Sequence, residues 1–313
     1  PWGSSDDEDN PTTVINTSFK EAFENFCKIA NLGATIEDIG NERRLRIEPI
    51  SYLRDVDNVV VDLGNLINEP SRTLDSDRLY TNVSVGYENQ EYEELNGVYA
   101  FNGTFGFSMP YEGDGNELDL VCNWRADDLG IELARRLQYE DTPSEDYRSD
   151  DDIFIIDSYN YYGTLIPLIV NNYFESIEGT FEPDRAYNLR ISPKRNLLRW
   201  QRELKASVFY KTNSYIKFIE GPSNPNLKTQ LTGDDVVDED ADMLVGDLRN
   251  PEYLPEILMI SEAPLTLEQW GELKRNKHGV VKFTHKGVDL YGFIKSIEFD
   301  INRKTANFEL LRA

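Results

Sequence analysis

The residues whose types and spacing come nearest to a known binding site are aspartates in an acidic segment. Asp238, Asp240 and Asp242 match the first, third and fifth ligands of an EF-hand calcium loop. That loop needs glycine at its sixth position, where this chain has Met243, and glutamate at its twelfth, where it has Arg249. We therefore predict a solvated run of charge here and no calcium site.

Histidine and cysteine are too few, and too far apart, for the usual metal or nucleophile chemistry. His278 and His285 flank an expected strand, without the one-face helical spacing of a zinc-peptidase pair, and both are expected at the surface. Cys27 and Cys122 each lie in an apolar pattern, which predicts buried reduced thiols. No Gly-x-Ser-x-Gly motif and no cysteine in a cationic setting is present.

Glycine loops and carboxylate pairs give no better candidate. The turn at Gly113 and Gly115 has Leu118 where a dinucleotide-binding loop needs glycine, and Asp114 would repel phosphate. Catalytic carboxylate pairs have no local motif, and 57 acidic residues make many pairs available. We predict no catalytic residue, no metal, no cofactor and no enzymatic activity. A hydrolase with an unrecognised carboxylate site is kept as a lesser alternative.

One cluster of positive charge differs from the acidic background. Its members are Lys194, Arg195, Arg199, Arg202 and Lys205. They lie on an expected helix that starts with Ser192 as N-cap and Pro193 in the first helical position. The buried face of this helix is predicted to hold Leu197, Trp200, Leu204 and Val208. The basic residues form either a solvated face that pairs with the chain's own acids or a docking strip for an acidic partner, such as a neighbouring copy.

The overall charge limits the partners of the protein. With 57 acidic and 32 basic residues the net charge is -25, which disfavours nucleic acid and anionic membranes as partners. No apolar run reaches the roughly 18 residues that a transmembrane helix needs. Apolar residues make up 39% of the chain and aromatic residues 12%, which indicates a folded protein.

The N-terminal region is expected to begin with a helix and a hairpin. A helix is predicted from about residue 18 to 31, because Ser18 and Glu21 form a capping box and Gly33 closes the helix. Alternating apolar and polar residues then predict strands at 34–38 and 44–48. Further strands are predicted at 80–87, 100–108, 152–159 and 164–171, with a helix at 127–139 and a loop at 140–151.

The C-terminal region is predicted to be a small unit that follows an acidic linker or long loop. Its helix begins at Thr266, which forms a capping box with Gln269. Its strands are predicted at 257–260, 280–284, 290–299 and 305–311.

These elements indicate a β-rich α+β fold: a mainly antiparallel body, either barrel or sandwich, with a few helices, followed by a small helix-and-β-meander domain. The predicted organisation is a disordered lead-in at 1–13, the body at 14–220, the linker at 221–252 and the small domain at 253–313.

Several short blocks resemble structural proteins of phage tails and baseplate hubs. The helix-hairpin module is carried by Ser18-Phe-Lys-Glu-Ala-Phe, Leu32-Gly-Ala-Thr-Ile-Glu and Leu45-Arg-Ile-Glu-Pro. Blocks similar to those of phages and prophages of Bacteroidetes-type hosts are Asn96-Gly-Val-Tyr-Ala-Phe-Asn, Glu117-Leu-Asp-Leu, Arg125-Ala-Asp-Asp-Leu-Gly-Ile-Glu and Ser192-Pro-Lys-Arg-Asn-Leu-Leu. The resemblance implies a hub, baseplate or adaptor subunit that assembles with its own copies and with neighbouring tail proteins. It also implies assembly in the bacterial cytoplasm and a final location in the virion tail.

A second interpretation comes from the 17 tyrosines and 15 phenylalanines on a β scaffold. Sugars stack on exposed aromatic rings, so a carbohydrate-binding or adhesive surface module is the alternative. It depends on whether certain tyrosines form a flat exposed platform, namely Tyr80, Tyr87, Tyr159, Tyr161 and Tyr162.

Overall fold

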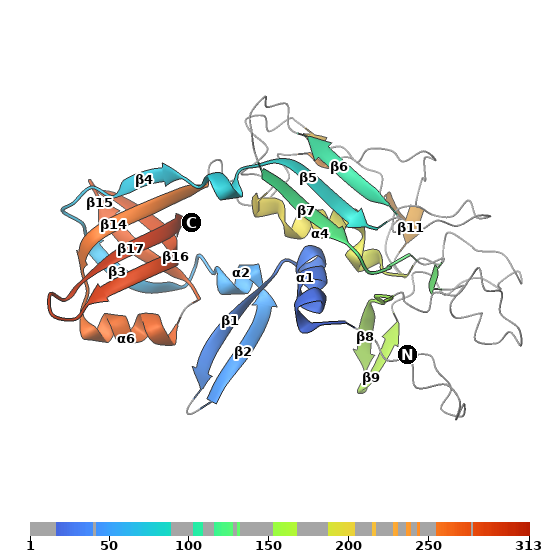
Figure 1. The fold of residues 1–313 in the computed structure, drawn as a ribbon, viewed down its shortest axis with the longest axis horizontal. Coiled ribbons are helices and arrows are strands. Elements are labelled where there is room, and N and C mark those ends of the chain that lie inside the picture. The colour runs from blue at the N-terminus through green and yellow to red at the C-terminus, as the bar shows by residue number, and fades with distance from the viewer. Residues whose placement is uncertain are drawn as a thin grey trace, which may run out of the picture.

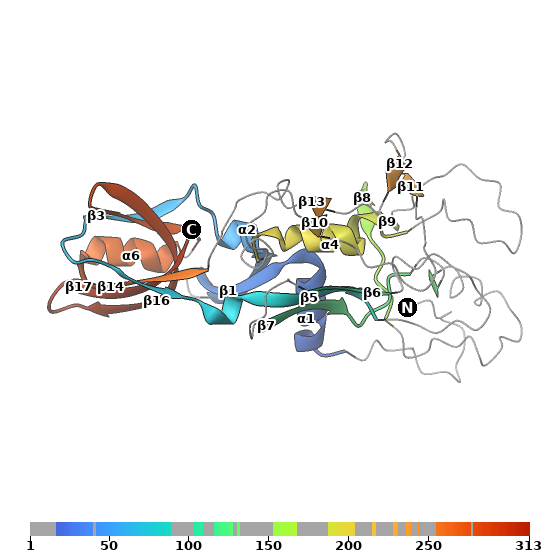
Figure 2. The same ribbon diagram turned by 90° about the horizontal axis from the view of Figure 1, so that it is seen from above.

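The computed structural model describes most of the chain in separate stretches. They are residues 17–39, 42–88, 103–108, 116–127, 130–131, 153–167, 187–203, 215–216, 228–230, 236–238, 243–244, 255–276 and 278–313. The described parts are arranged along one long axis, with a six-stranded sheet at one end and a three-stranded sheet towards the other (Figure 1). The view from above keeps this order (Figure 2).

The six-stranded sheet combines strands from both halves of the chain. Its order is β3 (Val59–Asn65), β15 (Val280–His285), β16 (Val288–Asp300), β17 (Thr305–Arg312), β14 (Glu256–Pro264) and β4 (Ser71–Leu74). All neighbours are antiparallel except β3 and β15. The predicted unit at 253–313 therefore leaves out two strands of its own sheet. Val61 and Leu63 of β3 lie in the same buried core as Leu258, Phe283 and Leu310.

Helix α6 (Leu267–Arg275) packs against this core through Leu273 and Trp270. Its predicted start is confirmed: Thr266 Oγ1 accepts the Gln269 N–H, and Gln269 Oε1 accepts the Thr266 N–H, which satisfies two otherwise unpaired donors. The strands predicted at 257–260, 280–284, 290–299 and 305–311 are also confirmed as β14 to β17.

The three-stranded sheet has the order β6 (Thr104–Ser108), β5 (Tyr80–Tyr87) and β7 (Asn116–Cys122). Helices α1 (Phe19–Ala30) and α4 (Pro193–Arg199) pack against it. Leu197 of α4 is completely buried beside Val83, Val85 and Leu120. Ile29 of α1 packs in a second cluster with Tyr87, Cys122 and Trp124.

Four two-stranded sheets complete the described part of the fold. The first is β1 (Leu32–Ile39) with β2 (Glu42–Pro49), followed by the short helix α2 (Ile50–Leu53). The second is β8 (Ser158–Tyr161) with β9 (Thr164–Pro167). Short helical turns lie at η1 (Ser76–Arg78) and η4 (Leu189–Ile191). The described residues of the predicted linker form β11 (Lys228–Gln230) with β12 (Val236–Asp238), and β13 (Met243–Leu244), which pairs with β10 (Tyr215–Ile216).

Some element boundaries differ from prediction for local reasons. Ser18 caps α1 as expected, but the helix ends at Asn31 and not at Gly33. Asn31 adopts the left-handed conformation with φ 49° and its N–H bonds Cys27 O, so β1 begins at Leu32. The strand predicted at 152–159 is wrong for 153–157, where only an isolated bridge joins Phe154 to Arg125, since β8 begins at Ser158.

The β-rich α+β fold class is confirmed, and the described strands form open sheets and not a barrel. Within the described ranges, no helix is long and apolar enough to cross a membrane. The predicted lead-in at 1–13 and the loop at 140–151 lie outside the described residues, as does most of the helix predicted at 127–139.

Candidate functional site

The hairpin β1–β2 has two faces of opposite chemistry. The strand register pairs Ala34 with Ile47 and Ile36 with Leu45, which places these four apolar side chains on one face. Ile36, Leu45 and Ile47 are 57%, 52% and 38% exposed. An alternating strand pair ordinarily buries its apolar face. Here that face is open to solvent among the described residues.

The opposite face of the hairpin contacts the short helix α2. A Cβ added at Gly33 would lie 2.5 Å from Leu53 Cδ1 and 3.0 Å from Ile50 Cδ1, so the strand packs closely against the ends of these two side chains. Because Gly33 and Glu37 lie on the same face of β1, α2 and the charged side chains share one side of the hairpin. The apolar face is turned away from both.

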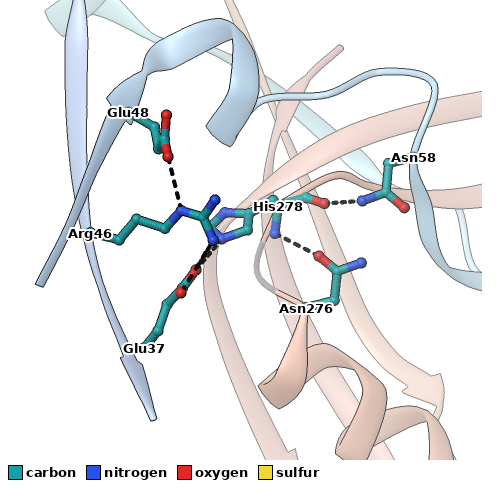
Figure 3. Close-up of polar contacts among 6 residues, drawn as sticks. All are labelled: Glu37, Arg46, Glu48, Asn58, Asn276 and His278. Atoms are coloured by element: carbon teal, nitrogen blue, oxygen red, sulfur yellow. Dashed lines mark hydrogen bonds and ion pairs between the residues drawn. The ribbon is translucent and has the colours of Figure 1, made fainter. Parts of the chain in front are cut away.

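Five charged or titratable side chains form a clamp between this hairpin and the segment that leads into β15, and Figure 3 shows four of them. His278 Nε2 lies 2.8 Å from Glu37 Oε1, and Arg46 Nη1 lies 3.4 Å from the same oxygen. Arg46 Nε donates to Glu48 Oε1 at 3.2 Å. The Tyr52 ring packs against Arg46 and His278, with its centre 4.6 Å from the Arg46 guanidinium carbon and 5.4 Å from the His278 ring centre. We call Glu37, Arg46, Glu48, Tyr52 and His278 the clamp.

The backbone around His278 is held firmly. Asn58 Nδ2 donates to the His278 carbonyl, and the His278 N–H donates to Asn276 Oδ1 at 3.1 Å. Gly279 follows with φ 143°, and an added Cβ would lie 2.2 Å from Asn58 O. This close approach, between β15 and the segment that leads into β3, accepts only glycine.

The electrostatics of the clamp favour the ionised form of Glu37. The hydrogen bond with His278 and the charge of Arg46 lower the pKa of its carboxyl, against the smaller opposing effect of burial. The contact between Glu37 and His278 holds the hairpin to the segment that leads into β15. None of the contacts in the clamp involves a serine, threonine or cysteine nucleophile. Across the described ranges, no group of three His, Cys, Asp or Glu could hold a metal ion.

Both histidines were predicted at the surface, and this is wrong. The His278 side chain is 15% exposed and that of His285 is 12% exposed. Cys122 is buried and Cys27 partly buried; both are free thiols, and burial raises the pKa of each. No local sequence pattern indicates the clamp, because Glu37 and His278 are far apart along the chain. The one available signal was the charged face of the predicted strands.

The predicted basic strip on α4 is largely used inside the chain. Arg199 Nη1 donates to Asn196 Oδ1 at 2.8 Å and to Ile29 O at 3.3 Å, and burial lowers its pKa. Arg202 lies 5.0 Å from the Phe293 ring centre and donates to Arg312 O at 3.3 Å. Lys194 and Arg195 are half-buried, and Lys205, like Leu204 and Val208, lies outside the described residues. Arg199 thus joins α4 to α1, and Arg202, in the helical residues 201–203 that follow Trp200, contacts the six-stranded sheet.

The five tyrosines of the carbohydrate interpretation are not brought together. Tyr87 is fully buried, and its hydroxyl donates to Ile191 O at 2.6 Å. Tyr80 is half-buried. Tyr159, Tyr161 and Tyr162 are exposed on the hairpin β8–β9, but the rings of Tyr161 and Tyr162 meet at 83°. They do not make a flat platform.

Two buried carboxylates deserve comparison with the hydrolase alternative. Burial raises the pKa of Asp127 and of Glu203. Asp127 Oδ1 accepts from Arg125 Nε at 3.1 Å, and Glu203 Oε1 lies 3.7 Å from Arg54 Nη1. Each carboxylate lies beside an arginine of the same chain, as is typical of buried charges in structural ion pairs.

Comparison with known proteins gives no relative to extend these observations. No family model, no curated protein and no solved structure matches the chain.

Proposed function

We propose that the chain is a structural subunit of a phage tail, a hub, baseplate or adaptor component, which acts by assembly with copies of itself and with neighbouring tail proteins. The observation that carries the proposal is the exposed apolar face of the hairpin β1–β2, held in place by the clamp. On this proposal the protein assembles in the bacterial host cytoplasm and ends in the virion tail.

The composition of the exposed face favours burial against another protein surface. Complete burial of a leucine or isoleucine side chain stabilises a complex by about 1.5–3 kcal/mol relative to exposure. Because Ile36, Leu45 and Ile47 remain partly exposed in the single chain, their further burial in a complex would stabilise it by several kcal/mol. Contiguous exposed apolar patches with polar borders are typical of interaction sites.

The charge of the hairpin also suits contact between copies. Residues 32–49 contain four acidic and three basic side chains, a net of -1, whereas the whole chain carries -25. Two copies of so acidic a protein repel each other at most approaches. A nearly neutral region is where that repulsion is weakest. The same reasoning allows a neighbouring tail protein of either charge to dock there.

The test is self-association measured by light scattering and sedimentation over a wide range of concentration. We expect the parent chain to form a discrete oligomer. The double variant Ile36→Asp with Leu45→Asp should associate at least about a hundredfold more weakly, since burying unpaired carboxylates costs several kcal/mol.

The matched control for this test is Ile67→Asp with Ile301→Asp, which adds the same two charges. These residues are 98% and 62% exposed and lie outside the hairpin, in the loops that follow β3 and β16. The control should associate like the parent. A parent chain that is strictly monomeric at every concentration, with no ring in electron images, would overturn the proposal.

A further inference from the structure

The hairpin β8–β9 presents an aromatic tip without any charge. Residues 158–167 contain no Asp, Glu, Lys or Arg, although these types make up 28% of the chain. Tyr159, Tyr161, Tyr162 and Leu165 are 41%, 56%, 92% and 70% exposed. The surface of this strongly acidic protein is thus interrupted by a neutral region rich in tyrosine.

The turn at the tip has Tyr162 at a position where a tyrosine is unfavourable. Tyr162 and Gly163 have φ of 48° and 86° between the paired residues Tyr161 and Thr164, which is the pattern of a two-residue type I′ turn. Such a turn favours Asn, Asp or Gly at its first position, and a bulky residue there is strained. The Tyr162 ring is almost wholly exposed, so its burial does not compensate the strain. Strained exposed residues of this kind are often kept for function.

The base of the hairpin is fixed, so the tip is presented in one arrangement. Asn188 is completely buried and its side chain accepts the Asp157 N–H at 2.7 Å. Its amide group also donates to Ala126 O and to Ile155 O, each at 2.8 Å. At the tip, Asn160 Oδ1 accepts the Gly163 N–H at 2.8 Å. A preordered loop loses less entropy when a ligand binds.

The chemistry of the tip indicates its ligand. The rings of Tyr161 and Tyr162 lie 4.7 Å apart at 83°, which makes an angled aromatic surface. Tyrosine supplies rigid area that is apolar on the ring and polar at the hydroxyl, while Ser, Asn and Gly supply adaptable hydrogen bonds. A sugar offers the matching groups, since its C–H face stacks on a ring and its hydroxyls pair with polar side chains.

Charge separates a neutral sugar from anionic partners. Anionic ligands are repelled by a chain of net charge -25 and find no cation in residues 158–167. We infer that the β8–β9 tip binds a neutral polysaccharide. The inference goes beyond the proposed assembly role and uses a different surface.

The test is electrophoresis of the intact chain through native gels that contain a neutral polysaccharide: dextran, laminarin or a galactomannan. A gel that contains alginate serves as the anionic comparison. We expect at least one neutral polymer to retard the parent chain, and alginate not to do so. Tyr162→Asn should weaken the retardation about tenfold, the loss expected for one stacked ring.

The choice of asparagine keeps the test independent of folding. Asn is favoured at this turn position, so Tyr162→Asn should melt no lower than the parent, and Tyr162→Gly provides a second variant with the same property. Leu165→Ala is the matched control, because it removes an exposed side chain of the same hairpin that has no ring.

Three results would overturn the inference: no retardation by any of the three neutral polymers, equal retardation of the parent and both Tyr162 variants, or equal weakening by Leu165→Ala. Self-association of the Tyr162 variants should equal that of the parent. If these variants lose association instead, the tip is a protein contact and the polysaccharide inference fails, while the assembly role stands.

Discussion

The hairpins β1–β2 and β8–β9 differ in which side chains they expose and in how each is held to the rest of the chain. The hairpin β1–β2 has an ion-paired face bound to the rest of the chain and a bare aliphatic face. The hairpin β8–β9 has no charge and exposes tyrosine rings. Two-stranded hairpins are barely stable alone in water, so each needs an anchor. The anchors are the clamp around Glu37 and His278 for the first, and the buried amide of Asn188 for the second.

The two exposed surfaces are suited to different kinds of partner. Aliphatic side chains gain free energy from burial over an area, which suits a protein partner. Tyrosines combine stacking with hydrogen bonds at a small site, which suits a sugar. Within the described residues, the first hairpin is fixed from its side by a separate unit of the fold, and the second is fixed at its base. Changes at the two anchors should therefore have separate effects.

The largest expected effect is at the base of the hairpin β8–β9. Asn188→Ala leaves Ala126 O, Ile155 O and the Asp157 N–H without their partner in a buried place. Each unpaired buried group costs about 1–3 kcal/mol, so we expect a loss of about 3–5 kcal/mol in the free energy of unfolding by denaturant titration. Asn160→Ala removes the single exposed bond to Gly163 and should cost about 1 kcal/mol or less. Equal losses in both variants would contradict the assigned anchor.

The next effect distinguishes two glycines with positive φ, one beside the clamp and one at the tip of the hairpin β8–β9. Gly279→Ala forces a Cβ to within 2.2 Å of Asn58 O at φ 143°, beside His278. We expect a loss of roughly 2–4 kcal/mol in the free energy of unfolding, from strain and steric overlap together.

Gly163→Ala is the comparison for this prediction. It lies at the tip with φ 86° and no atom within 4 Å of an added Cβ, so only backbone strain of about 1–2 kcal/mol applies. Thermal unfolding of the two variants side by side checks the order. A greater loss at Gly163 would show that the approach of β15 to Asn58 is not tight.

The sequence predicted the parts of the fold that depend on neighbouring residues. The starts of α1 and α6 follow from Ser18 and Thr266, whose side chains bond the N–H groups three residues on. The strands of the C-terminal unit follow from alternation over short distances. The pairing of β3 with β15 does not, because Val59 and Val280 carry no signal of each other across the intervening residues.

The candidate site on the hairpin β1–β2 was not predicted, for the same reason. Alternation placed Ile36 and Leu45 on strands, but it does not say whether the apolar face is covered. Arg199 and Arg202 were predicted to lie on a solvated face or a docking strip, and their contacts in the structure include a backbone carbonyl of α1 and the ring of Phe293. Such contacts depend on how distant elements pack together, which local pattern does not contain.

A smaller effect tests the clamp through pH. Because the folded-state pKa of Glu37 is lowered, its ionised form contributes stability above the carboxyl's ordinary pKa, and this contribution is lost as pH falls through the lowered value. The difference in unfolding free energy between the parent and Glu37→Gln should therefore be full near neutral pH and shrink on acidification. Glu42→Gln controls for loss of one carboxylate on the same hairpin. A difference that is constant with pH would show that Glu37 acts through packing alone.

The smallest expected effect has the opposite sign and concerns the tip of the hairpin β8–β9. Tyr162→Asn replaces a strained residue with one suited to φ 48°, and the ring that it removes is 92% exposed and buries little. The unfolding free energy should rise by about 0.5–1 kcal/mol, and thermal unfolding should shift upward accordingly. Thr164→Asn, at the neighbouring position on β9, offers no such relief and should not stabilise. A loss of stability in Tyr162→Asn would mean that the ring supports the hairpin by contact with Tyr161, and that its exposure is not evidence of a binding role.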